Sequence, residues 1–380
     1  MALAGDDKDC YHSQNGDSHS GMNETAQRWG IAGLLALSVA ACTPISAVEG
    51  RRPLVAGAEL QPVYAATIRA SRFEQEREST AFAPFSYSAY GVSIPPDHPP
   101  GQLPKHIKGT GVDPAVNFVG VGRRDFAGGN AFASVVAAAP AGELVIFAHG
   151  FNTSFADTIT TQAQIAHDLH LTGPQVVFGW PAANSPLAYE ADQQRAAESS
   201  EELAELVEQL AAARPGRVVV AGYSMGAPIV IGALQQLRNN RTLLSRLDVV
   251  LFAPDIGVED FAKMMQGLPP LAAPVTIFGS HSDRILRLAR ITFHKPGPQL
   301  GAAKSAADLP DVPVTFVDVG NVAHTGNGHF TLVCYPPLIA MFTAMPDRHF
   351  AAFAQALESY PSAQVTRNGQ ATYVQLPAIE

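Results

Sequence analysis

The chain has 380 residues, of which 47% are hydrophobic and 16% charged, and its net charge is −9. This length and apolar content allow a large core, and one large α/β domain with flanking segments is the natural division. The acidic balance without a basic run argues against nucleic-acid binding, and the three cysteines, Cys10, Cys42 and Cys334, form neither a disulfide framework nor a metal-binding spacing.

An apolar segment near the amino terminus has the pattern of an export signal. Arg28 precedes the stretch 30–41, which is too short to span a bilayer. The stretch ends in Val39-Ala40-Ala41-Cys42, which resembles a bacterial lipobox. The resemblance implies that Cys42 is acylated and becomes the first residue of the mature protein. The alternative is a short buried helix over the same stretch.

The lipobox sets the expected division of the amino-terminal part. We expect residues 1–21 to be a disordered leader or a mis-assigned start, because their acidic residues do not suit a signal peptide. Residues 22–41 would be the lipoprotein signal peptide and residues 42–62 a proline-containing linker. By resemblance to lipoproteins, Thr43 after the cysteine indicates the outer membrane if the host has one. We therefore expect a cell-envelope location on the periplasmic side, with a lipid anchor.

Three strands are predicted before the central part of the chain. They cover residues 63–69, 86–94 and 116–121, and four prolines interrupt the chain between the last two. We expect them to form an antiparallel edge or cap on the main sheet.

From Glu143 onward, apolar strands alternate with helical patterns. This alternation predicts a mostly parallel, doubly wound sheet with its chemistry at the carboxyl ends of the strands. The domain would span 63–350, with a helix and hairpin extension over 351–380, where Asn368-Gly369 is a hairpin signal. The expected strands are 144–147, 176–178, 218–221, 249–252, 275–278 and 314–317, and the expected helices are 155–170, 191–213, 227–238, 259–266, 284–291 and 338–343.

The strand at 218–221 is followed by Gly222-Tyr223-Ser224-Met225-Gly226 and then by a helical pattern. This is the G-x-S-x-G turn in the strand–turn–helix setting that projects a nucleophilic serine above a sheet. The glycines remove the Cβ atoms that would clash in so tight a turn. Ser224 is therefore the candidate nucleophile. The alternative is a structural turn whose serine caps the helix.

A serine needs a base to take its proton and an acid to orient that base. The preferred base is His329, in a glycine-rich loop after the last strand of the alternating region, with His324 of the same loop as the alternative. The preferred acid is Asp283, after the strand at 275–278, with Asp255 as the alternative. The chain order serine, acid, histidine is that of the α/β-hydrolase arrangement.

An oxyanion hole requires two backbone N–H groups. One is expected from Met225, the residue after the nucleophile, and the other from Phe151 in the loop after the strand at 144–147. Gly150 would let that loop approach the serine, and His149 would brace it.

Several motifs together resemble a bacterial α/β-hydrolase family of unassigned function that is described as esterase-like or lipase-like. The motifs are HGFNTSF at 149–155, FGWPAA at 178–183, YEAD at 189–192, GYSMG at 222–226, APD at 253–255, SHSDR at 280–284 and GHF at 328–330. The resemblance covers about residues 63–345. It implies an α/β-hydrolase fold with antiparallel amino-terminal strands and a triad of Ser224, Asp283 and His329. Tyr223 and Ala182 depart from residues common in that family and would reshape the pocket.

These observations predict a lipid-anchored serine hydrolase that cleaves a small-molecule or lipid carboxylic ester. We expect no metal ion, no organic cofactor and no nucleic-acid partner, and the sequence identifies no protein partner. A peptidase, thioesterase or acyltransferase could use the same triad. A further alternative is a non-catalytic envelope lipoprotein that uses the scaffold for binding.

Overall fold

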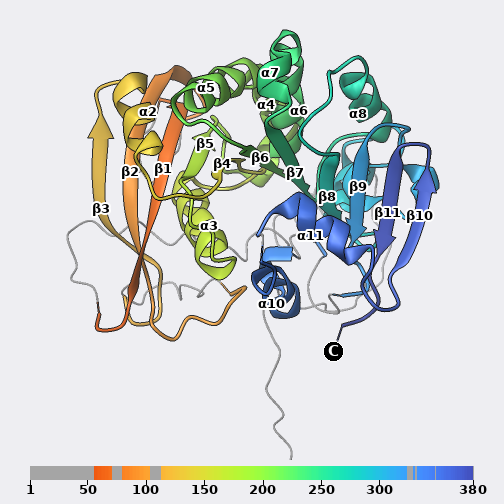
Figure 1. The fold of residues 1–380 in the computed structure, drawn as a ribbon. Coiled ribbons are helices and arrows are strands. Elements are labelled where there is room, and N and C mark those ends of the chain that lie inside the picture. Colours follow the sequence, from red (N-terminus) through yellow and green to blue (C-terminus); the bar gives the residue numbers. More distant parts are fainter. Residues whose placement is uncertain are drawn as a thin grey trace, which may run out of the picture.

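A single mixed sheet runs through the part of the molecule that the structure, a computed structural model, describes (Figure 1). The described residues are 55–70, 79–102, 113–322, 328–329, 332–346 and 348–379. The sheet has eleven strands in the order β10-β11-β9-β8-β7-β6-β4-β5-β1-β2-β3. The strands are β1 (Glu59–Arg69), β2 (Phe82–Ile94), β3 (Val119–Phe126), β4 (Leu144–Ala148), β5 (Gln175–Gly179), β6 (Val218–Tyr223), β7 (Leu247–Phe252), β8 (Val275–Gly279), β9 (Val314–Asp318), β10 (Gln364–Asn368) and β11 (Ala371–Gln375).

The strand directions agree with the sequence-based expectation. Strands β5, β4, β6, β7, β8 and β9 pair in parallel, and β1 pairs in parallel with β5. Strand β2 pairs antiparallel with β1, and β3 pairs antiparallel with β2. At the other edge, β11 pairs in parallel with β9 and antiparallel with β10. The mostly parallel sheet with antiparallel amino-terminal strands is an α/β-hydrolase fold, as the sequence predicts.

Helices cover both faces of the sheet (Figure 1). One face carries α2, α5, α6 and α8, and the other carries α3, α10 and α11. Successive residues of each central strand point to opposite faces, so the sheet has a hydrophobic core on each side. In β4, for example, Ile146 packs in the first of these cores and Phe147 in the second. The helices are α2 (Gly129–Ala137), α3 (Phe155–Asp168), α4 (Tyr189–Glu198), α5 (Ser200–Ala213), α6 (Gly226–Gln236), α7 (Arg241–Leu244), α8 (Val258–Met265), α9 (Arg284–Thr292), α10 (Pro336–Thr343) and α11 (Phe350–Leu357).

Two predicted elements differ from those in the structure. The helix expected over 191–213 is two helices, α4 and α5, which meet at Ser199. The second one packs closely on α6, since a Cβ on Gly232 would lie 2.3 Å from Oγ of Ser200. Strand β1 begins at Glu59, inside the segment predicted as a linker.

Several predictions fall outside the described residues. These are the leader, the signal peptide, Cys42 and His324. Within the described ranges, none of the helices combines the length and apolar character needed to cross a bilayer.

Candidate active site

Ser224 occupies the tight turn between β6 and α6. Its φ of 51° lies in the left-handed region, which L-residues rarely adopt outside functional turns. A Cβ on Gly226 would lie 2.2 Å from the carbonyl oxygen of Ala148, and one on Gly222 would lie 2.8 Å from Cα of Ala227. Both glycines are thus required by close backbone approach, as the motif predicts. The turn holds the serine hydroxyl at the carboxyl end of the parallel strands.

His329 joins Ser224 to Asp283. Its Nε2 lies 3.0 Å from Oγ of Ser224, and its Nδ1 lies 2.7 Å from Oδ2 of Asp283. When the imidazole is neutral with its proton on Nδ1, that N–H donates to the carboxylate and Nε2 accepts from the serine hydroxyl. The other carboxylate oxygen accepts from the backbone N–H of Leu286 at 2.9 Å, so Asp283 also caps α9. The structure therefore brings together the three residues that the sequence favoured.

The carboxylate changes the basicity of the imidazole. Burial alone would lower the pKa of His329, but the charge and hydrogen bond of Asp283 and the charge of Asp255 together raise it above the ordinary value. The ring is therefore a stronger base than an isolated histidine. A base of this kind, hydrogen-bonded to a serine hydroxyl, can take its proton during nucleophilic attack.

Asp255, the alternative acid, lies beside the serine turn but is engaged elsewhere. Its backbone N–H donates to the carbonyl of Ser224 at 3.1 Å. Its carboxylate accepts from Nζ of Lys295 at 2.7 Å and from the hydroxyl of Tyr189. Asp283, and not Asp255, therefore forms the hydrogen bond to Nδ1 of His329.

The loop predicted to complete the oxyanion hole lies against the serine turn. A Cβ on Gly150 would lie 3.1 Å from the carbonyl oxygen of Tyr223 and 3.2 Å from Cβ of Ser224. The backbone N–H groups of Phe151 and Met225 donate to no acceptor among the described residues. An oxyanion hole requires two such N–H groups, so both residues remain candidates for it.

His149 contacts Trp180, and this contact supports the loop. Its ring stacks on Trp180 with centroids 5.1 Å apart, and the indole N–H of Trp180 donates to the carbonyl of His149 at 2.9 Å. Burial, helped by the charge of Arg69, lowers the pKa of His149 to about 3. The ring is therefore neutral, and its position suits support of the loop.

Sequence reasoning missed an aromatic group formed by Phe151, Tyr189 and Phe293. The ring of Tyr189 stacks on Phe293 with centroids 4.0 Å apart and meets Phe151 edge-on at 5.1 Å. Nζ of Lys295 lies 4.9 Å from the centroid of the Tyr189 ring. Phe293 and Lys295 come from the segment after α9, and no short-range sequence pattern links them to Tyr189. Tyr189 and Lys295 both bond to the carboxylate of Asp255, and this links the aromatic group to the serine turn.

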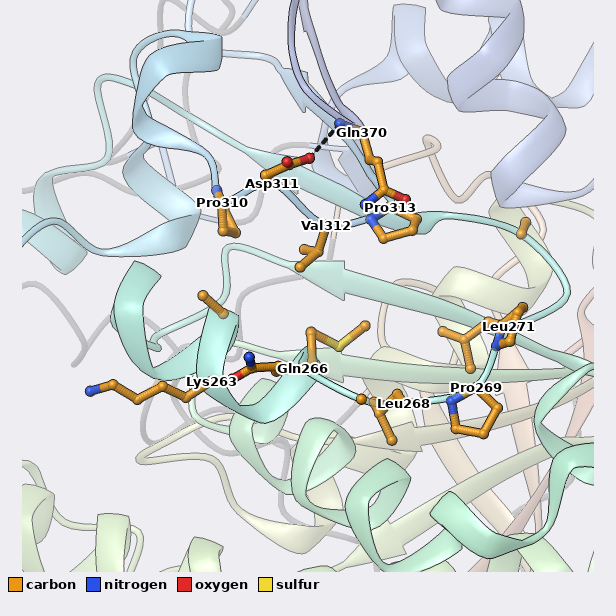
Figure 2. A pocket seen from close by; sticks show the side chains of 15 residues that line it. Lys263, Gln266, Leu268, Pro269, Leu271, Pro310, Asp311, Val312, Pro313 and Gln370 are labelled. Carbon is orange, nitrogen blue, oxygen red and sulfur yellow. Dashed lines mark hydrogen bonds between the residues drawn. The ribbon is translucent and has the colours of Figure 1, made fainter.

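A cavity of about 650 Å³ lies elsewhere in the fold (Figure 2). It is lined by the end of α8, the segment before β8 and the turn before β9, where the backbone N–H of Gln370 donates to Asp311 at 2.8 Å. These segments precede the amino ends of β8 and β9, whereas Ser224 follows the carboxyl end of β6. The cavity is therefore separate from the candidate active site.

A family model matches a little more than half of the chain. It is described as an alpha/beta hydrolase of unknown function (DUF900), and it matches residues 125–327. The match includes Ser224, Asp255 and Asp283 and ends just before His329. No curated protein matches the chain significantly.

Solved structures with some likeness to the chain include several hydrolases. A cutinase from Trichoderma reesei is 13% identical over 59% of this chain and 87% of that chain, with a TM-score of 0.29. A putative α/β-superfamily hydrolase from Xanthomonas campestris is 18% identical over 58% and 99%, with a TM-score of 0.28. The carboxylesterase EstE1 from a metagenomic library is 12% identical over 88% and 96%, with a TM-score of 0.33.

Proposed function

Because this chain belongs to the α/β-hydrolase family of unknown function (DUF900), we propose that it is a serine hydrolase that cleaves a carboxylic ester. Ser224 is the nucleophile, His329 the general base and acid, and Asp283 the acid that orients the imidazole. The observation that carries the proposal is the position of His329, 3.0 Å from the serine hydroxyl and 2.7 Å from the carboxylate.

The reaction would proceed in two stages. Oγ of Ser224 attacks the ester carbonyl while Nε2 of His329 takes its proton, and the N–H groups of Phe151 and Met225 stabilise the oxyanion. The imidazolium then protonates the departing alcohol and leaves an acyl-serine. A water molecule, deprotonated by His329, attacks this ester, and the carboxylic acid is released as the serine regains its proton. Asp283 keeps the proton-bearing Nδ1 in place throughout.

The aromatic rings of Phe151, Tyr189 and Phe293 support an apolar acyl group, which we expect to be of small or medium size. Phe151 and Phe293 flank Tyr189, and aromatic rings of this kind offer apolar surface to an acyl chain. A lipid anchor at Cys42 would place the enzyme near envelope lipids, which supports an acyl ester there as substrate. Fractionation of cells would test the anchor: the Cys42→Ala protein should leave the membrane pellet, and a protein that stays there would argue against acylation.

Fluorophosphonate labelling of the purified protein tests the proposed chemistry. The wild type should be labelled and should hydrolyse short-chain p-nitrophenyl esters, whereas Ser224→Ala should do neither. Ser282→Ala is the matched control, because its hydroxyl bonds to Ser280 and not to His329. Absence of labelling in well-folded wild type would favour the non-catalytic binding alternative.

A substrate panel separates ester hydrolysis from the other reactions of such a triad. Oxygen esters, thioesters and peptides should be offered at equal concentration, with an added alcohol to reveal acyl transfer. We expect the highest kcat/KM for an oxygen ester. A preference for peptides or water-soluble thioesters would contradict the proposed substrate class and leave the triad intact.

A further inference from the structure

A second cluster of chemically active side chains lies where α3 ends. Oδ1 of Asp168 lies 3.1 Å from Nε2 of His98 and 3.0 Å from Nδ1 of His167. The three donor atoms all lie within 4.8 Å of one another. His98 and Asp168 have side chains only 1% exposed, and that of His167 is 23% exposed. Two imidazole nitrogens thus converge on one carboxylate oxygen in a nearly closed site.

We propose that His98, His167 and Asp168 bind a divalent transition-metal ion, with Zn²⁺ as the fitting probe. Two imidazoles and one carboxylate are ligands that Zn²⁺ accepts, and water can take a fourth position. In a tetrahedral site with bonds of about 2.0–2.2 Å, neighbouring ligand atoms are about 3.3–3.5 Å apart. The two separations from Oδ1 of Asp168 to the imidazole nitrogens, 3.1 and 3.0 Å, need to open by only a few tenths of an ångström.

The surroundings of Asp168 orient it as a monodentate ligand. Its other oxygen, Oδ2, accepts from the backbone N–H of Gly101 at 2.7 Å and from the side-chain amide of Gln164 at 3.2 Å. These bonds leave Oδ1 directed at the two imidazoles. Outer hydrogen bonds of this kind fix metal-binding carboxylates in position.

Binding an ion at the nitrogens that face Asp168 moves the proton of each neutral imidazole to its other ring nitrogen. If Nδ1 of His167 binds the metal, the proton of the neutral ring moves to Nε2, which lies 3.6 Å from a carboxylate oxygen of Glu59. For His98, binding through Nε2 moves the proton to Nδ1. That nitrogen is buried without a hydrogen-bond partner among the described residues. Without the ion, Nε2 carries the proton and donates to Oδ1 of Asp168, so metal binding replaces this hydrogen bond.

Charge balance also favours a cation. The Asp168 side chain is buried, and hydrogen bonds from the backbone N–H of Gly101 and the side-chain amide of Gln164 to Oδ2 favour its charged form. No lysine or arginine among the described residues forms an ion pair with Asp168 or Glu59. The competing explanation is a proton on His167, held by its hydrogen bond to Oδ1 of Asp168. Metal titration distinguishes the two.

The cluster lies away from the candidate active site. Asp168 ends α3 just before β5, and His98 follows β2, whose last residue, Ile94, pairs with Glu59 at the start of β1. Both segments are therefore at the amino ends of the parallel strands, whereas Ser224 follows the carboxyl end of β6. A bound ion would tie the segment after β2 to α3, which lie on the same flank of the molecule (Figure 1).

Zinc binding to the purified full chain tests the proposal. After EDTA treatment and dialysis, titration with ZnCl₂ should show one ion per chain by calorimetry and elemental analysis, with a rise in Tm. His167→Gln keeps an amide donor for Asp168 but loses the imidazole ligand, and its affinity should fall by about 100-fold or more. His170→Gln is the matched control, because His170 lies just past the same helix end and outside the cluster.

The result that overturns the proposal is equal zinc affinity in wild type, His167→Gln and His170→Gln, or no stoichiometric binding by wild type. Circular dichroism and the zinc-free Tm establish that each variant is folded. EDTA should leave ester hydrolysis unchanged, because the cluster is remote from Ser224. Failure of zinc binding and failure of the proposed esterase activity are thus read from separate assays.

Discussion

His329 decides the pH range in which the proposed enzyme works. The ring must be neutral to accept the proton of Ser224, and Asp283 raises its pKa above the ordinary 6.5. Activity should therefore be present above this raised pKa and be lost as the pH falls through it. We expect kcat/KM, measured from about pH 5 to about pH 9, to show an apparent pKa above 6.5 in its acid limb. An acid limb centred below that value would contradict the assignment.

The two candidate acids can be separated by the same assay. Asp283→Asn should lower kcat by about 10⁴-fold, because the amide no longer holds the productive tautomer of His329. It should also move the acid limb to lower pH. Asp255→Asn should cost far less, because its carboxylate bonds to Lys295 and Tyr189. A larger loss for Asp255→Asn than for Asp283→Asn would reverse the roles.

Lys295 and Asp255 form an ion pair with little solvent contact, their side chains being 11% and 3% exposed. Lys295→Met removes the cation and leaves the carboxylate, and breaking a buried pair in this way costs about 3–5 kcal/mol. We expect the free energy of unfolding in urea to fall by about 3 kcal/mol. The double variant with Asp255→Asn should recover much of the loss.

A surface pair provides the control for that measurement. Lys263 and Asp260 are 71% and 62% exposed at a separation of 3.6 Å, so Lys263→Met should change stability by less than about 1 kcal/mol. Similar losses for Lys263→Met and Lys295→Met would show that burial does not control the effect.

At the scale of elements, the proposed oxyanion hole depends on the close contact between the loop after β4 and the turn after β6. A Cβ on Gly150 would lie 2.9 Å from Cδ1 of Tyr223, closer than real Cβ atoms come. Gly150→Ala should therefore displace the N–H of Phe151 and lower kcat by about 10²–10³-fold, the cost of one oxyanion donor. Gly122→Ala in β3, where nothing lies within 4 Å, should leave kcat unchanged. An unaffected Gly150→Ala enzyme would remove Phe151 from the oxyanion hole.

The sequence predicted the elements that carry unbroken apolar runs or a turn with strict steric demands. The strands from β4 to β9 and the turn at Ser224 were predicted because an apolar run and the spacing of two glycines are local signals in the sequence. The split of α4 from α5 was not predicted, because Ser199 has an ordinary helix propensity and no glycine or proline marks the break. Helix α7 has only four residues and α2 is rich in small residues, so neither shows a clear helical period of large apolar residues.

The proximity of Ser224, Asp283 and His329 was predictable because each residue follows a strand whose carboxyl end lies at the same edge of the sheet. The surroundings of this triad were not predictable. Tyr189, Asp255 and Lys295 lie far apart in the chain, and only the fold brings the last two within 2.7 Å. The same holds for His98 and Asp168, whose spacing matches no metal motif and whose contact depends on the path of the chain after β2.

At the scale of the whole molecule, the carboxyl-terminal hairpin supports the end of the sheet next to the acid. The ring of Tyr373 stacks on Phe316 of β9, and its hydroxyl donates to the fully buried Asp318 at 2.7 Å. The same carboxylate holds the ring of His281, two residues before Asp283, also at 2.7 Å. The hairpin thus connects to the loop that presents the acid.

Tyr373→Phe tests this connection. It removes one donor to a buried carboxylate, and a hydrogen bond to a charged group contributes about 1.5–3 kcal/mol. We expect the free energy of unfolding to fall by that amount. Tyr360→Phe, outside this network, should change it little. Equal losses in the two variants would show that the bond to Asp318 adds no specific stability.

The two outer strands, β3 and β10, have a consequence for how these molecules behave at high concentration. An outer strand offers unpaired backbone groups on which another chain can add. In β3 the side chains of Arg123, Arg124 and Asp125 are exposed, and in β10 that of Arg367 is exposed. A strand docking there would have to strip water from these charges. The charged side chains on β3 and β10 therefore disfavour edge-to-edge association of the sheets of two molecules.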